Sequence, residues 1–210
     1  EMLAIEVAKA SGIRVQDARL IDSDGVPVVL IKRFDREGTS RKMYLSAASM
    51  LDDFEGTDDH AYTEFADIIR TRCASVTRDM EEMWRRMVFN ILIKNVDDHL
   101  HNHGFLHVKK DKWELAPAFD INPFPEKQHI LKLWISEESG LSGEMSAALS
   151  CAPRFGIEAP RAKVIVQEVV RGTGQWQVLA RKIGLRRRDV DELAPAFEHR
   201  QRDEAVVFAS

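Results

Sequence analysis

The feature that most constrains this chain is a polar segment, residues 95–104, in which seven of ten side chains can ligate a metal or exchange hydrogen bonds. It follows a long stretch with apolar residues at helical spacing and precedes a short apolar strand pattern. Carboxylates beside a packed core are costly to desolvate unless something pairs with them. The sequence therefore predicts a functional loop inside a folded unit.

Composition excludes several classes of protein. With 210 residues, 44% of them hydrophobic, the chain can bury a sizeable core and is too apolar for disorder. It has neither the roughly 20-residue apolar run of a membrane span nor the start of a secretory signal, so we expect a cytoplasmic protein. Cys73 and Cys151 lack metal-site spacing and are expected to be reduced thiols. The net charge of −4 gives no field for nucleic acid, and the basic run 186–188 is typical of a solvated face.

The first part of the chain is expected to form a helix and a hairpin. Apolar residues at helical spacing predict a helix over residues 1–11, which Gly12 ends. Residues 14–21 and 28–31 are expected to be strands joined by a turn, and the β-branched run of the second is typical of a buried strand. A helical pattern that starts at the first residue, with no Met before it, is what we expect of a piece of a longer protein.

From residue 46 onward the pattern is mainly helical. Thr77 and Asp79 are expected to cap a long helix whose apolar stripe forms core, namely Met80, Trp84, Met87, Val88, Ile91 and Leu92. Two short strands fit the next apolar runs, and three prolines in residues 117–125 oppose regular structure. These strands are expected at residues 105–108 and 113–115, and later helices at residues 142–149, 160–171, 175–183 and 188–197.

One chemistry that the polar segment could perform is phosphoryl transfer. Asp97 and Asn102 have the D-x-x-x-x-N spacing of a kinase catalytic loop, in which the Asp orients and deprotonates the substrate hydroxyl and the Asn holds magnesium. A second metal carboxylate is needed, and Asp120 follows the expected hairpin in the order that kinases use. The spacing alone is weakly specific, and the hairpin and the aromatic residue before Asp120 add to it.

A second chemistry is hydrolysis at a transition metal. Imidazole and carboxylate groups both suit zinc, manganese or iron. Histidines at every second position converge only on an extended strand, whereas Gly104 and the preceding helix predict a tight turn. A satisfied polar turn is the third interpretation. The candidate metal ligands would be Asp97, Asp98, His99, His101 and His103.

Residues 93–106, followed by residues 113–123, resemble the signature of the HipA-like serine/threonine protein kinases, the toxins of type II toxin–antitoxin pairs. Residues 32–36 resemble the family's segment after the last strand of the small lobe. The resemblance covers nearly the whole chain. It implies an α+β, protein-kinase-like fold, in which residues 1–36 are a remnant of the small lobe ending in the hinge and residues 37–210 form the mainly helical catalytic lobe.

The resemblance also implies ATP and Mg²⁺ as cofactors. Asp97 would be the catalytic base, and Asn102 and Asp120 would bind magnesium. The implied partners are a cytoplasmic protein substrate, such as a translation factor or an aminoacyl-tRNA synthetase, and a DNA-binding antitoxin of the HipB type. The remaining nucleotide-binding residues implied are His99 and His101 near the phosphates, Phe119 beside the metal aspartate, and Lys32, Arg33 and Phe34 at the adenine hinge, although Phe34 could also be a plain core aromatic.

The sequence departs from the family in two elements. The glycine-rich phosphate loop and the strand lysine that contacts the ATP phosphates are not found in these residues, so this chain alone is expected to bind ATP weakly. Two other functions stay open. One is a small-molecule kinase of the aminoglycoside phosphotransferase type, which the residues flanking Asp97 disfavour, and the other is a non-catalytic binding module that kept the fold.

Overall fold

Nine α-helices, two short 3₁₀-helices and seven strands make up the part of the chain described by the computed structural model, residues 1–53 and 60–210. The α-helices are α1 (Met2–Ala10), α2 (Ala47–Met50), α3 (Tyr62–Arg72), α4 (Val76–Leu92), α5 (Met145–Cys151), α6 (Ala159–Thr173), α7 (Trp176–Lys182), α8 (Arg187–Phe197) and α9 (Arg200–Ala209). The strands are β1 (Ala18–Ser23), β2 (Val26–Ile31), β3 (Arg36–Glu37), β4 (Ser40–Arg41), β5 (Tyr44–Ser46), β6 (Gly104–Lys109) and β7 (Lys112–Leu115). The helical pattern expected from residue 46 onward also falls on residues 54–59, which lie outside the described residues.

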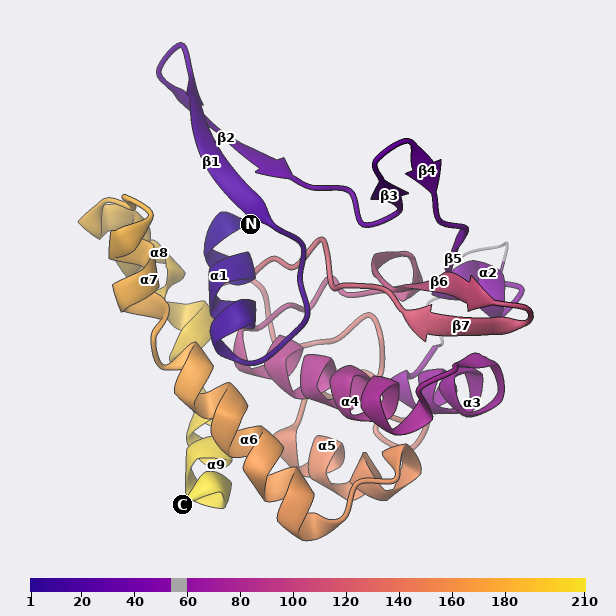
Figure 1. The fold of residues 1–210 in the computed structure, drawn as a ribbon. Helices are drawn as coiled ribbons and strands as arrows, with labels where there is room; N and C mark the ends of the chain where they lie inside the picture. Colours follow the sequence, from indigo (N-terminus) through magenta and orange to yellow (C-terminus); the bar gives the residue numbers. More distant parts are fainter. Residues whose placement is uncertain (54–59) are drawn as a thin grey trace.

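Helix α4 runs through the middle of the body and packs against α3, α5, α6 and α9 (Figure 1). Its predicted apolar stripe is buried, with Trp84 and Met87 completely inaccessible to solvent. The predicted cap is wrong. The helix begins after Ser75 without a side-chain cap, and the carboxylate of Asp79 lies inside the protein, where it accepts the backbone N–H of Leu115 at 3.1 Å. The carboxylate of Asp79, which the sequence assigned to the helix end, therefore bonds to strand β7 instead.

A three-stranded antiparallel sheet, in the order β5-β6-β7, follows the polar loop. The hairpin β6–β7 confirms the two strands predicted there, while β5 was not predicted because it has only three residues. Gly104 begins β6 where a Cβ atom would collide with the ring of Tyr44, so the sheet requires glycine at that position. The sheet thereby sets where the polar loop ends.

The hairpin β1–β2 extends away from the helical body (Figure 1). Asp24 and Gly25 turn it with φ of 54° and 81°, the left-handed conformation that such a tight turn needs. The second strand was predicted to be buried, and this is wrong: Leu30 is 40% exposed and Ile31 is 37% exposed. The β-branched pattern correctly indicates a strand, but burial depends on elements that would cover its faces, and none of the described residues does so.

The C-terminal half is helical, as predicted, with shifts of a few residues at the helix ends. Helix α6 packs against α1 and α9, and the ring of Trp176 on α7 stacks on Phe197 at 4.7 Å between centroids. Helix α9 was not predicted because its apolar residues form no clear stripe, and Val207 is 77% exposed.

Cys73 and Cys151 are free and buried. Across the described ranges, no helix combines the length and apolar character needed to cross a bilayer.

Candidate functional site

The polar segment forms a loop between α4 and β6. Helix α4 ends at Leu92, and Lys94 adopts a left-handed backbone with φ of 55°, which turns the chain out of the helix. A single turn of 3₁₀-helix, Leu100–Asn102, then leads into β6. Its backbone is braced from the segment that follows β7, because Phe124 donates its N–H to the Lys94 carbonyl and Lys132 donates to the Val96 carbonyl, each at 3.2 Å.

Asp98 is the buried anchor of this loop. Its Oδ2 accepts from the Tyr62 hydroxyl, from the Asn90 amide at 3.0 Å and from the His103 ring at 2.7 Å. Burial alone would raise the pKa of the Asp98 carboxyl, but His103 and the Tyr62 hydroxyl together hold that pKa below its ordinary value. Burial and the neighbouring carboxylate raise the pKa of Tyr62 well above its usual value, so the hydroxyl stays a donor. These contacts attach the loop to α3 and α4.

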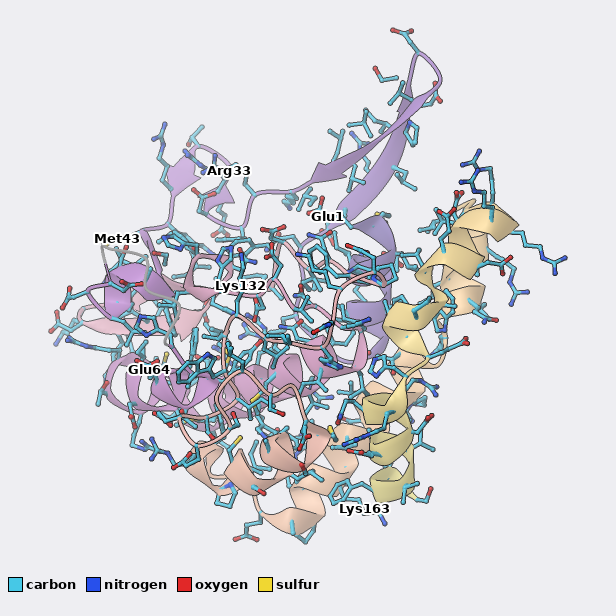
Figure 2. The ribbon with its side chains drawn as sticks, turned by 180° about the vertical axis from the view of Figure 1, so that it is seen from behind. Glu1, Arg33, Met43, Glu64, Lys132 and Lys163 are labelled. Atoms are coloured by element: carbon cyan, nitrogen blue, oxygen red, sulfur yellow. The ribbon has the colours of Figure 1, made fainter. Side chains whose placement is uncertain are left out.

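Asp97 points to the other side of the loop, where it is partly exposed. Its Oδ1 lies 2.8 Å from the ammonium of Lys132 and 3.7 Å from that of Lys127. The hydrogen bond from Lys132 lowers the pKa of Asp97 and, with the second lysine, outweighs a small effect of burial. Figure 2 shows Lys132 on the body of the molecule. Neighbouring aspartates thus have different environments: Asp98 is fixed inside, and Asp97 stays ionised at the surface.

Asn102 shares a small internal cavity with the segment that carries Asp120. The cavity is lined by Asn102 from the loop and by Phe119 and Ile121, which flank Asp120. The side chain of Asn102 is 7% exposed, and its amide makes no hydrogen bond to any described residue. Neither amide atom is sealed from solvent, so the amide is free to bind water or another ligand. The structure therefore brings Asn102 and the flanks of Asp120 together.

Asp120 itself is exposed and has a strained backbone, with φ of 53°. Its Oδ1 accepts from the Asn122 amide at 2.9 Å, which leaves the remaining lone pairs of the carboxylate available. The left-handed conformation turns the chain sharply between Phe119 and Ile121. Strain of this kind is concentrated at functional sites.

A second buried network positions the segment before Asp120. The guanidinium of Arg86 donates to the Ala116 carbonyl at 2.7 Å and to Glu82 at 2.9 Å. Arg14 donates to the Leu115 carbonyl at 3.1 Å and to Asp79 at 3.2 Å. Burial lowers the pKa of Arg14 against the opposing effect of Glu82. The hydrogen bonds of Arg14 and Arg86 to the Leu115 and Ala116 carbonyls fix where the backbone after β7 leaves the sheet.

The three predicted hinge residues have different surroundings. Phe34 packs between the rings of Tyr44 and Phe119, with 5.5 Å between centroids in each pair. Arg33 is exposed and forms a two-point ion pair with Asp35, which lowers the pKa of that carboxyl to about 2. Lys32 lines an open cavity at the base of the hairpin. Phe34 thus links the chain after β2 to Phe119 and the segment of Asp120.

The histidines of the loop do not form a metal centre. His99 and His101 lie edge to face at 5.7 Å, and His101 is exposed. His103 is instead committed to Asp98. Within residues 1–53 and 60–210, no three His, Cys, Asp or Glu side chains are arranged to hold a metal ion. This disfavours the transition-metal interpretation.

Sequence reasoning missed the residues that hold the site in place. Lys132 lies 35 positions from Asp97, and no local pattern in the sequence signals their contact. Tyr62, Arg14 and Arg86 are similarly distant from the residues they position. The only signal available was chemical: two adjacent carboxylates near a core require partners.

Comparison with known proteins identifies the family and the fold of the chain. The family model for the HipA-like C-terminal domain matches residues 1–177. A Haemophilus influenzae protein named "Putative kinase" is 26% identical over 143 residues, which are 60% of this chain and 42% of that protein.

Two solved structures share the fold over 100% of the chain. One is HipA in the toxin–antitoxin complex of HipA, HipB and operator DNA from Shewanella oneidensis MR-1, with a TM-score of 0.70, 13% identity and 54% of that chain covered. The other is the proinflammatory kinase CtkA of Helicobacter pylori, with a TM-score of 0.56, 15% identity and 87% of that chain covered. The chain thus spans about half of the HipA chain and less than half of the Haemophilus protein, and its fold is kinase-like.

Proposed function

Because the chain belongs to the family of HipA-like C-terminal domains, we propose that it forms the catalytic lobe of a protein kinase. The proposed reaction is transfer of the γ-phosphoryl group of ATP, with magnesium, to a serine or threonine hydroxyl of a protein. Its relatives include a protein named as a kinase, and its fold is shared with the kinase CtkA.

The observation that carries the proposal is the difference, within one loop, between Asp98 on one side and Asp97 and Asn102 on the other. Asp98 is buried and fully engaged, and it attaches the loop to the core. Asp97 is left partly exposed and ionised beside Lys132, and Asn102 is left with an amide that has no partner in the described chain. A loop that only closed a turn would have no need to keep one carboxylate and one amide available on a rigid support.

The residues present fit a magnesium nucleotide. Asn102 and Asp120 offer an amide and a carboxylate, the oxygen ligands that Mg²⁺ prefers, on two segments that line one cavity. When bound, the ion would neutralise charge that develops on the transferred phosphoryl group. Lys32, Arg33 and Phe34 would contact adenine through their main chain, which is consistent with an Arg33 side chain committed to Asp35. His99 and His101 would lie near the phosphates, and Phe119 beside the metal aspartate.

Asp97 would orient the substrate hydroxyl and accept its proton. Lys132 supports this role because it keeps the carboxylate ionised and fixes its direction. A lowered pKa makes Asp97 a weak base, so its larger contribution would be to position the hydroxyl. Transfer would then depend mainly on alignment and on charge neutralisation, as in other phosphoryl transfers.

A DNA-binding antitoxin of the HipB type is the partner that we propose for the whole protein. The support is that the HipA of Shewanella oneidensis, whose fold this chain shares, was solved with HipB and operator DNA. The serine/threonine specificity, the toxin role and a substrate such as a translation factor or an aminoacyl-tRNA synthetase are part of the same proposal.

The test is Asp97→Asn in the full-length protein, assayed with labelled ATP for transfer to protein. We expect transfer to fall by about 10²-fold or more while ATP binding is kept, because the metal ligands remain. Asp120→Ala should instead weaken magnesium-dependent ATP binding. Asp111→Asn, in the exposed turn between β6 and β7, is the matched control. Transfer near the wild-type level in Asp97→Asn contradicts the assignment, and a wild-type protein that binds no ATP would favour the non-catalytic module.

A further inference from the structure

A cavity of about 320 Å³ lies where the start of α9 meets the end of α4 and the segment before α5. Its lining includes Lys94, His129, Glu144, His199, Arg200 and Gln201, and Asp97 is not among the lining residues. The space is on the order of ten water volumes. It can therefore hold a small polar group together with part of the molecule that carries the group.

Gln201 presents a free donor to this cavity. Its side chain is 8% exposed, and its Oε1 accepts the backbone N–H of Met145 at 2.7 Å. That bond assigns the orientation of the amide, so the NH₂ group is on the other side. The NH₂ group makes no hydrogen bond to any described residue. The residue is largely buried but its Nε2 atom is not sealed from solvent, so the amide can donate to an acceptor from outside the chain or to water.

The beginning of α9 adds two backbone donors. This helix has ten residues and no side-chain cap. The N–H groups of Arg202 and Asp203 bond to the His199 carbonyl, whereas those of Arg200 and Gln201 have no acceptor within the described residues. Free N–H groups and the helix dipole both favour an anion at this end of a helix.

The charged groups of the lining favour an anion as well. Lys94 and Arg200 contribute two cations, and Glu144 contributes one carboxylate. Lys94 donates one hydrogen bond, to the Pro125 carbonyl at 3.0 Å, and has further donors available. Arg200 pairs with Glu204 at 2.8 Å and lies 3.8 Å from Glu144, which is half exposed. Burial lowers the pKa of His129 to about 4, so its ring is neutral and adds no charge at pH 7.

We propose that this cavity binds a phosphate group, either free or as a monoester, held by the N–H groups that begin α9, by the Gln201 amide and by Lys94 and Arg200. Each donor is of a kind that binds phosphate oxygens, and phosphate can use several of them at once. Glu144 is the one carboxylate in the lining, and it competes with the ligand for Arg200, as does Glu204 on the same helix. The site is separate from the proposed catalytic residues, and its occupancy can be tested without any kinase reaction.

The experiment is calorimetric titration of the purified protein with inorganic phosphate and with O-phosphoserine, at an ionic strength held constant with chloride. Gln201→Glu keeps an oxygen to accept the Met145 N–H but replaces the NH₂ donor by a negative charge, and it should weaken phosphate binding at least tenfold. Glu144→Gln removes the competing carboxylate and should strengthen binding several-fold. Arg188→Ala removes a comparable exposed ion pair, with Glu192 on α8, and should leave binding unchanged.

The outcomes separate the sources of the phosphate. Tighter binding of O-phosphoserine supports a ligand that fills the cavity beyond its phosphate, and equal binding of both probes supports free phosphate as the ligand. The proposal is overturned if neither probe binds above the chloride background, or if Gln201→Glu and Glu144→Gln both bind like the wild type. The unfolding midpoint of each variant without phosphate shows whether the variant is folded.

Discussion

The loop that carries Asp97 belongs to the proposed site, and the hairpin β1–β2 leads into the proposed hinge residues; this chain supports the two regions in different ways. Beneath the loop lie Asp98 and the buried groups of α3 and α4 that bond to it. The hairpin has a regular register of six residue pairs, yet its apolar side chains face solvent. One region is held by buried tertiary hydrogen bonds, and the other mainly by its own pairing, with contacts from β1 to α1 at its base.

This difference indicates which residues of the proposed site hold their geometry before a ligand binds. The loop residues keep their geometry because buried hydrogen bonds would have to break before they could move. A two-stranded hairpin alone is at best marginally stable, so its position depends on whatever covers it. Of the residues assigned to the hinge, only Phe34 is packed, between Tyr44 and Phe119. The metal and base residues are therefore expected to be more rigid than Lys32 and Arg33.

The largest effect is expected from breaking the anchor of the loop with Asp98→Ala. This change leaves the Tyr62 hydroxyl, the Asn90 amide and the His103 ring without their shared acceptor in a buried place. We expect a loss of about 3–5 kcal/mol in the free energy of unfolding, measured by urea denaturation.

Its matched control is the adjacent aspartate. Asp97→Ala removes only a partly exposed ion pair with Lys132 and should cost less than about 1 kcal/mol. Equal losses for the two variants would contradict the division of the loop into a buried and an exposed side.

The same contrast, between elements covered by other parts of the chain and elements left exposed, explains how much of the fold could be predicted from the sequence. The stripe of α4 and the hairpin β6–β7 were predicted because apolar periodicity along the chain reports directly on burial of one face. The burial of β2 was predicted wrongly because its β-branched residues would give the same pattern whether or not another element covered them. Asp79 was assigned to the helix cap because its contact with Leu115 joins positions 36 residues apart.

The sequence predicted which residues carry the chemistry of the candidate site, but it did not predict which residues hold them in place. The order of Asp97, Asn102 and Asp120 is readable because the spacing of reactive residues is local and specific. Local sequence holds no information about Lys132, which reaches Asp97 only after the chain has folded back past β7. It also could not say which of the two adjacent aspartates is buried, since both have the same side chain and nearly the same neighbours.

Lys132→Ala is expected to have an intermediate effect on stability, and it tests the contrast between Asp97 and Asp98. Because the hydrogen bond from Lys132 lowers the pKa of Asp97, that pKa should rise toward the ordinary value near 3.9 in the variant. Titration of the carboxyl carbon by NMR measures it, and Lys163→Ala, on α6, is the control (Figure 2).

The sign of the effect on stability follows from this pKa. A carboxyl whose pKa is lower in the folded state stabilises the fold above its unfolded pKa, and the contribution is lost as pH falls through the folded pKa. Wild type should therefore exceed Lys132→Ala in stability at neutral pH, and the difference should shrink in acid. An unchanged pKa for Asp97 would show that Lys127, at 3.7 Å, is its effective partner.

The smallest effect is expected at the hairpin, where Leu30→Ala on β2 removes a side chain that is 40% exposed. Since little apolar area leaves water when this hairpin forms, the free energy of unfolding should change by less than about 1 kcal/mol. Leu115→Ala on β7 is the matched control, because that leucine is also in a strand but fully buried, and its loss should cost about 2–5 kcal/mol. Urea denaturation of both variants compares the two regions directly. If Leu30→Ala destabilised the protein as much as Leu115→Ala, the exposed face of the hairpin would have to be covered in solution, and the contrast between the loop and the hairpin would fail.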